Sequence, residues 1–217
     1  MPSVLFRKIK SKIKPVWKTA FFSAVIFGFA AHLYKMTNWL PNWDSLVFRE
    51  DPQHMESLGR WFLPAASGIS SDYELPWLNG LLAVFYISAA AVFICETLGV
   101  ESRMSALLIG AVTVTFPAVT STFAYCYVAD AYALSFLLDC AAVYLLVCRK
   151  ELCAAAAAVV LMAVSMGIYQ AYITAAIALL TASLIIETAS SGESAVQSVK
   201  RALKYAVCGI AAFALYY

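Results

Sequence analysis

The sequence predicts an all-α, polytopic membrane protein, and three observations lead to this fold class. The chain is 63% hydrophobic and only 13% charged, with a mean hydropathy of +0.79, whereas soluble domains are ~45–50% apolar and ~25% charged. Its apolar residues come in blocks of roughly 15 to 20, enough for a helix to cross ~30 Å of hydrocarbon. The blocks do not alternate with a period of two, which argues against a β-barrel.

The chain begins with a basic segment, residues 1–18, which carries six lysines and arginines and no acid. Basic residues beside a membrane helix stay in the cytoplasm, so we expect a cytoplasmic N-terminus. Residues 19–34 form the first predicted span. The span is read as an uncleaved anchor, because no small-x-small cleavage site separates it from the polar region that follows.

Residues 36–75 form the longest polar interval and are predicted to be an extracytoplasmic loop. The interval holds six of the thirteen acidic residues. Apolar side chains at helical spacing predict two short helices that lie along the membrane surface. The first begins after Pro41 and Asn42; the second begins near residue 53 and ends around Pro64 and Gly68.

Further spans are predicted at residues 76–95, 104–122 and 131–148. Residues 152–186 then carry no charge. A helix of that length would measure ~52 Å, so we expect two spans joined by an outer turn around residues 167–170. Residues 187–204 are predicted to be an inner loop, and a seventh span begins near residue 205. The chain is thus expected to be one transmembrane domain, 1–217, of about seven helices, truncated at its C-terminal side within a helix.

The positive charges agree with this arrangement. Twelve of the fifteen lysines and arginines fall in segments predicted to be inside. This bias follows the positive-inside rule and predicts a multi-pass protein of the cell membrane with its long loop outside.

Several classes of protein are not indicated. The six cysteines form no CxxC pair and none lies in the long loop, so neither a disulfide framework nor a zinc site is expected. The sequence has no phosphate-binding loop, HExxH, GxSxG or GxGxxG motif. It also has no pattern typical of nucleic-acid binding.

The loop supplies the first candidate site residues. Asp44 could act as a general base on a sugar hydroxyl, or it could cap a short helix that begins at Ser45. Arg60 could pair with a lipid phosphate, or it could be an ordinary interfacial arginine that reaches toward the head groups. Arg49 and Lys35 are weaker candidates for the same role, and Trp61 lies beside Arg60 at the expected head-group depth.

Four further polar residues are candidates. Asp130 could bind a sugar or a metal at the outer mouth of the bundle, or begin a helix. Tyr169 and Gln170 could line a substrate cleft, or belong to a turn with an aromatic belt. Asp139 falls near mid-membrane and should therefore face the bundle interior, a partner or a cavity. Asp130 and Asp139 are nine residues apart, half a turn out of phase on a helix, so they are not a paired-carboxylate site.

The chain resembles the bacterial Gtr-type membrane glucosyltransferases that decorate O-antigen and related surface glycans. The matching elements are WDS at 43–45, SLGRWFLP at 57–64, PWLNGLLA at 76–83, FAYCYVADAYALSFLL at 123–138 and IYQAY at 168–172. Their order and spacing cover most of the chain, and the LGRW and PWLNGLL elements are the specific ones.

This resemblance implies a GT-C-like enzyme that takes a hexose, glucose, from a polyprenyl-phosphate donor and passes it to a surface glycan such as O-antigen. It makes Asp44 the candidate catalytic base, with Arg60 holding the donor phosphate. No cofactor is expected. A divalent metal stays open, although the sequence offers no clear ligand set for one. Two alternatives stay open: a subunit of a lipid-linked glycan flippase or transporter, and an inactive truncated fragment.

Overall fold

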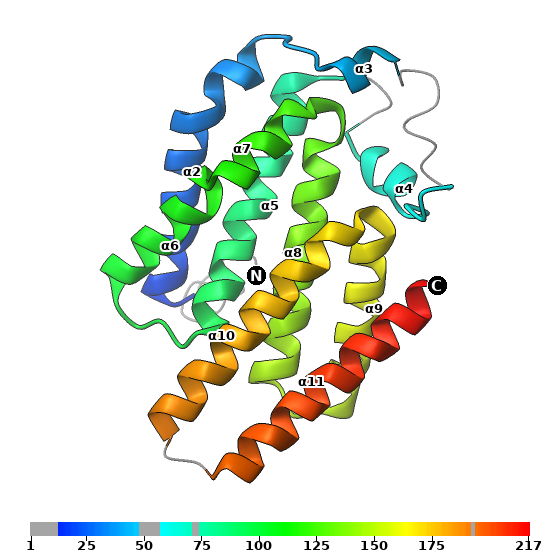
Figure 1. Cartoon of the computed structure of the whole chain (residues 1–217). Helices are drawn as coiled ribbons and strands as arrows, with labels where there is room; N and C mark the ends of the chain where they lie inside the picture. Colours follow the sequence, from blue (N-terminus) through cyan, green and yellow to red (C-terminus); the bar gives the residue numbers. More distant parts are fainter. Residues whose placement is uncertain (1–12, 48–56, 71–73, 192–193) are drawn as a thin grey trace, which may run out of the picture.

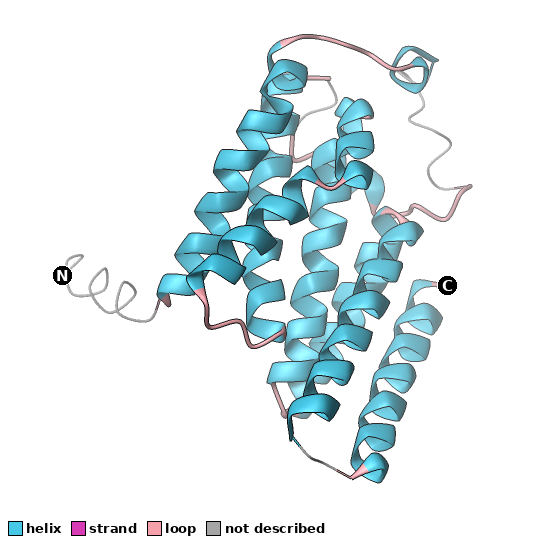
Figure 2. Ribbon diagram, turned by 60° about the vertical axis from the view of Figure 1, so that its left-hand side comes forward, coloured by secondary structure: helices cyan, strands magenta, loops and turns pink. Residues whose placement is uncertain are grey.

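The structure is a computed structural model, and it describes residues 13–47, 57–70, 74–191 and 194–217. The described residues form helices, turns and loops and contain no strand. Five helical segments are long and apolar enough to cross a membrane: Pro15–Thr37, Pro76–Thr97, Arg103–Ala124, Cys126–Cys148 and Gln170–Ser190. The predicted fold class, a polytopic all-α membrane protein, is therefore confirmed, and Figures 1 and 2 show its helices as one bundle.

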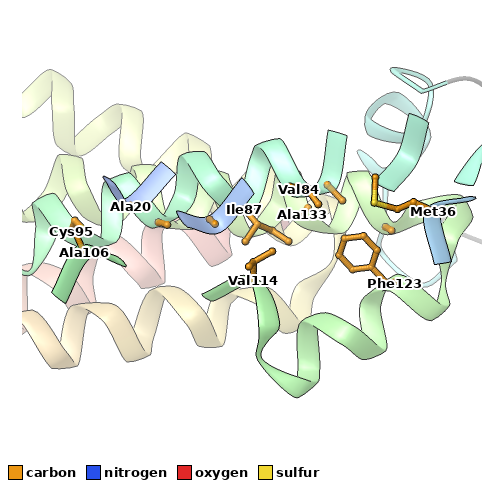
Figure 3. Close-up of a cluster of buried hydrophobic side chains, with 13 residues drawn as sticks. Ala20, Met36, Val84, Ile87, Cys95, Ala106, Val114, Phe123 and Ala133 are labelled. Carbon is orange, nitrogen blue, oxygen red and sulfur yellow. The ribbon is translucent and has the colours of Figure 1, made fainter. Parts of the chain in front are cut away.

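The first half of the bundle contains α2 (Pro15–Thr37), α5 (Pro76–Thr97) and α6 (Arg103–Thr115). The helix α2 turns small residues inward at every fourth position: Ala20, Ala24 and Gly28. Small residues at this spacing let helix backbones approach closely. The approach is closest at Gly110 of α6, where an added Cβ would lie 2.3 Å from the Ala20 carbonyl oxygen. Figure 3 shows the buried side chains that these helices share.

The second half contains α8 (Ala129–Cys148), α9 (Leu152–Ile168), α10 (Ile173–Ser191) and α11 (Ala195–Tyr216). A second cluster of buried side chains fills the space between them, including Leu146 and Met162. The helix α8 packs on both α5 and α9 and so joins the two halves. The halves are therefore one packed bundle.

Two breaks interrupt the helices of the bundle, and a proline explains the first. Phe116 adopts an extended conformation before Pro117, so the third predicted span divides into α6 and α7 (Pro117–Ala124), because proline disfavours the α conformation in the residue before it. The predicted turn around 167–170 is also present. The helix α9 ends at Ile168, and a single turn of 3₁₀-helix, η2 (Gln170–Tyr172), leads into α10.

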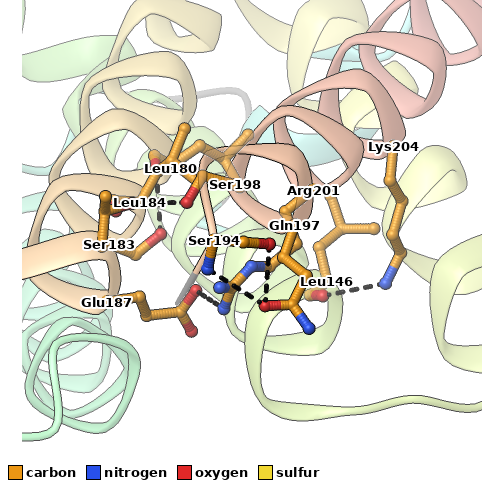
Figure 4. A network of polar contacts seen from close by, with 11 residues as sticks. Leu146, Leu180, Ser183, Leu184, Glu187, Ser194, Gln197, Ser198, Arg201 and Lys204 are labelled. Carbon is orange, nitrogen blue, oxygen red and sulfur yellow. Dashed lines mark hydrogen bonds and ion pairs between the residues drawn. The ribbon is translucent and has the colours of Figure 1, made fainter. Parts of the chain in front are cut away.

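One end of the bundle carries the short helices α3 (Trp43–Val47) and α4 (Leu63–Ser67) and is called the loop end below. The opposite end, where α10 meets α11, is called the charged end. There Lys14 pairs with Glu96 at 2.7 Å, and Arg201 pairs with Glu187 at 2.6 Å. Figure 4 shows the second pair beside Lys204, whose ammonium donates to the Leu146 carbonyl. These ion pairs join the residue before α2 to α5, and α10 to α11.

Two predicted details are wrong. Residues 187–204 are not an inner loop, because α10 continues to Ser191 and α11 begins at Ala195. Glu187 of this stretch lies on α10, whereas its lysines and arginine belong to α11, and Ser194 and Gln197 form a capping box at the start of α11. The second loop helix is also later than expected: residues 57–62 form turns, and Pro64 lies in the first turn of α4 instead of ending a helix. Residues 53–56 of the expected helix lie outside the described residues.

Candidate functional site at the loop end

The segment that contains Arg60 is fixed to the end of α9. The Phe62 amide N–H donates to the Gly167 carbonyl at 2.8 Å. The indole of Trp61 lies against Gly167, so closely that an added Cβ there would fall 2.7 Å from the ring. The absence of a side chain at Gly167 therefore makes room for the Trp61 ring. Together the two contacts fix the residues that follow Arg60.

Gln170 holds the same segment from the other side. Its amide nitrogen donates to the Leu58 carbonyl at 2.6 Å and to the Tyr216 hydroxyl at 2.8 Å. Gly59 lies between these groups with a φ of +76°, a conformation that glycine adopts readily. Gln170, the first residue of η2, thus connects the loop to α11.

Arg60 lies over an aromatic stack. The rings of Tyr132 and Tyr169 are stacked with their centroids 4.4 Å apart. The Arg60 guanidinium carbon is 4.6 Å from the centre of the Tyr169 ring, and one guanidinium N–H donates to the Tyr132 hydroxyl at 3.3 Å. A guanidinium is always charged and binds aromatic faces as well as oxyanions. The stack therefore holds a fixed positive charge at the loop end.

Asp44 lies in the first turn of α3 and is partly exposed. It does not cap a helix beginning at Ser45, because α3 begins at Trp43 and the Asn42 side-chain oxygen accepts the Ser45 amide N–H at 2.9 Å. Asn42 therefore caps the start of α3, and Asp44 is a residue within its first turn. The capping interpretation of Asp44 is therefore wrong.

Asp44 and Arg60 lie at the same end of the bundle. Both charges are within electrostatic reach of Tyr127, which belongs to the 3₁₀ turn η1 (Cys126–Val128) before α8. A carboxylate from α3 and a guanidinium from the segment before α4 therefore share the loop end. Sixteen positions separate them in the sequence. A carboxylate can take up a proton, and a guanidinium can bind an oxyanion.

The comparisons with known proteins decide the family. The family model described as glucosyl transferase GtrII matches residues 33–217, which is most of the chain. The chain belongs to the GtrII glucosyl transferase family. This GtrII family member is therefore a membrane glycosyltransferase, and the resemblance noted in the sequence is confirmed. No curated protein and no solved structure matches the chain.

Glu74 is a residue of this GtrII family member that the sequence did not single out. Its carboxylate accepts the Trp39 indole N–H at 2.7 Å and the Ser45 hydroxyl at 3.3 Å. The second of these contacts brings Glu74 beside the residue that follows Asp44. Nothing in the sequence pairs positions 45 and 74, since the intervening loop has to fold first.

Asp130 is in the first turn of α8 and only 1% exposed. Its carboxylate accepts an N–H of Asn79 at 3.2 Å, and the same amide donates to the Ser70 hydroxyl at 3.3 Å. Asn79 also accepts the Leu75 amide N–H. Asp130 therefore lies beneath the loop and joins α5, α8 and the segment after α4, while its proposed role in binding sugar or metal stays a prediction.

Asp139 faces the bundle interior, as predicted, and is 0% exposed. Neither of its carboxyl oxygens has a hydrogen-bond partner within the described ranges. The nearby Ser165 hydroxyl is engaged with that of Ser135 at 2.8 Å. Asp139 is far along α8 from Asp130, so the two form no pair.

Arg49 and Lys35 are the remaining candidates for binding a phosphate. Arg49 lies outside the described residues. Lys35 lies in the last turn of α2, and its ammonium donates to the Leu40 carbonyl in the connection to α3. Within the described residues, no three His, Cys, Asp or Glu side chains gather where they could hold a metal ion.

Proposed function

We propose that this GtrII family member is a GT-C-like enzyme that moves a hexose, glucose, from a polyprenyl-phosphate donor to a surface glycan such as O-antigen. The reaction would take place at the outer side of a bacterial cell membrane, where the loop end faces away from the cytoplasm. The observation that carries the proposal is the Arg60 guanidinium, held over the Tyr132–Tyr169 stack at the loop end, with Asp44 in the first turn of α3 at the same end. The family supports sugar transfer, and this pair supports a phosphate-linked donor.

The chemistry assigns one role to each side chain. Asp44 removes the proton of an acceptor hydroxyl as its oxygen attacks the anomeric carbon of the donor sugar. The bond between that carbon and the phosphate oxygen breaks, and its electron pair leaves with the lipid phosphate. Arg60 stabilises the charge that develops on that phosphate through charge-assisted hydrogen bonds.

The experiment is a transfer assay in membranes with polyprenyl-phosphate glucose and the host's surface glycan. Replacing Asp44 with Asn removes the base and keeps the shape, so transfer should fall by about 10²- to 10⁴-fold. Glu101→Gln is the matched control, because this glutamate is exposed at the charged end. Retained transfer in Asp44→Asn would contradict the assignment. If Glu74→Gln alone lost transfer, the base would be Glu74 instead.

Arg60 is tested in the same assay. Arg60→Gln should lower transfer by about 10²- to 10³-fold, the usual effect of removing one group that stabilises developing negative charge. Arg60→Lys keeps the charge but not the planar fork, so it should restore only part of the activity. Equal rates for the three proteins would remove Arg60 from the mechanism.

A lipid-linked glycan flippase or transporter subunit is the second candidate function. The observation that favours it is Asp139, an acidic residue completely buried in a membrane-spanning helix, since such residues often mark a transport path. Reconstituted vesicles distinguish the two functions. Movement of a labelled lipid-linked sugar across the bilayer without sugar transfer would support the transporter.

A further inference from the structure

A cleft of about 560 Å³ lies between the two halves of the bundle, toward the loop end. Its walls come from α5, α6, α7, α8 and the η2–α10 segment. Its volume is within the usual range of ligand-binding sites, ~300–1,000 Å³. The cleft is separate from the polar contacts around Asp44, and its lining is almost wholly apolar.

The cleft opens sideways toward the membrane. Val112 and Phe116 line it and are 57% and 56% exposed. Small side chains make room for an occupant on two helices, with Ala133 on α8 and Ala175 and Ala178 on α10. An apolar chain could therefore enter from the lipid without crossing water.

Arg60 does not line the cleft, but it contacts a residue that does. Tyr169 lines the cleft, and the Arg60 guanidinium lies 4.6 Å from the centre of its ring. Beside it the Tyr172 hydroxyl and the Thr122 hydroxyl lie 3.2 Å apart and bridge η2 to α7. A ligand that follows this path needs an anionic head at Arg60 and an apolar tail below it.

We infer that the cleft binds the isoprenoid chain of a polyprenyl phosphate, with the phosphate at Arg60. This inference rests on the proposed function, whose donor is such a lipid. From Ala171 to Ala178 the cleft follows α10 for ~10 Å, about a third of the hydrocarbon thickness. The site therefore recognises the part of the chain nearest the phosphate, and the rest of the chain remains in the bilayer.

The test is photolabelling of the 217-residue chain in lipid nanodiscs, without any glycan acceptor. The probe is a farnesyl monophosphate with a diazirine near the end of its chain, and the labelled peptides are identified by mass spectrometry. We expect labels on α7 and α10, removed by excess unmodified farnesyl monophosphate. Phosphatidic acid with short acyl chains offers the same head group and should not compete.

Two variants locate the chain. Ala178→Trp fills the cleft and should reduce labelling about tenfold, because the chain loses apolar contact worth that factor in affinity. Ala178→Leu repeats the test with a smaller side chain. Ala157→Trp is the matched control, an exposed alanine of α9 outside the cleft, and its labelling should stay unchanged.

Three results would overturn the inference: labels only on helices that do not line the cleft, equal labelling of Ala178→Trp and Ala157→Trp, or equal competition by phosphatidic acid, which would make the cleft a site for ordinary lipids. The outcome is independent of sugar transfer, since binding is measured alone. A chain that labels as expected but transfers no sugar would contradict the proposed function only. A chain that transfers sugar with an unlabelled cleft would contradict the inference only.

Discussion

Gly59 and Gly99 both have positive φ angles, +76° and +63°, but their surroundings differ. A Cβ at Gly59 would lie 2.3 Å from the Tyr216 hydroxyl and 3.0 Å from the Gln170 amide nitrogen, whereas at Gly99 nothing is within 4 Å. Backbone conformation requires glycine at both positions. Only at Gly59 do neighbouring side chains require it as well.

This pair gives a matched prediction. Gly99→Ala should cost about 1–2 kcal/mol of stability for the left-handed backbone. Gly59→Ala should cost about 1–3 kcal/mol more from overpacking and should also lower sugar transfer, because Arg60 is its neighbour. Thermal unfolding in detergent and the transfer assay measure both effects. Equal losses for the two variants would show that the Gly59 contacts contribute nothing.

Asp139 gives a prediction of the opposite sign. A buried polar group without a hydrogen bond destabilises a fold by about 1–3 kcal/mol. Asp139→Leu, which replaces the carboxyl with an apolar group of similar shape, should therefore raise the thermal unfolding temperature. Asp130→Leu is the contrast: its carboxylate is hydrogen-bonded to Asn79, so this variant should be less stable. A destabilised Asp139→Leu would reveal a partner for that carboxyl.

At the scale of the helix, the α2–α6 contact depends on the absence of a side chain at Gly110. An added Cβ there would meet the Ala20 carbonyl oxygen at 2.3 Å and the Ala24 amide nitrogen at 3.0 Å. Backbone atoms cannot move aside as a flexible side chain can. The close contact also lets the Ser23 hydroxyl donate to the Leu107 carbonyl at 2.7 Å.

Gly110→Val should separate these helices and cost at least about 1–3 kcal/mol, the usual effect of overpacking. Gly209→Val in α11 is the control, since nothing lies within 4 Å of its Cβ position. The yield of folded protein in size-exclusion chromatography and the unfolding temperature report the difference. If both variants behaved alike, the close packing of α2 on α6 would be refuted.

At the scale of the whole molecule, the two exposed cysteines lie at the charged end. Cys148 ends α8 and Cys153 begins α9, and both are exposed, while the other four thiols are buried. Trp43 at the loop end is 76% exposed. These positions report which end faces which side of the membrane.

With the loop end outside, a membrane-impermeant maleimide should leave Cys148 and Cys153 unlabelled in intact cells and label them after permeabilisation. A cysteine introduced as Trp43→Cys should be labelled in intact cells. Twelve of fifteen basic residues are predicted on the inner side, which is the physical basis for this orientation. The reverse pattern of labelling would invert the topology and move the proposed reaction to the cytoplasm.

The sequence by itself determined the membrane class, most of the helices and the main breaks between them. These features depend on local properties, such as the length of an apolar block and the proline at the start of α5. The break before Pro117 was not predicted, because residues 104–122 were expected to form one span. Where charge was used as a sign of a loop, at residues 187–204, the prediction failed. An amphipathic helix can carry lysine and arginine on one face and remain continuous.

Only the tertiary structure decided how the site is assembled. It placed Arg60 over the Tyr132–Tyr169 stack, brought Glu74 to Ser45, and packed the Trp61 ring against Gly167. It also formed the apolar cleft from five separate segments. These contacts join residues that are distant in the chain, and their partners are set by the packing of α8, α9 and α11, which no local pattern encodes.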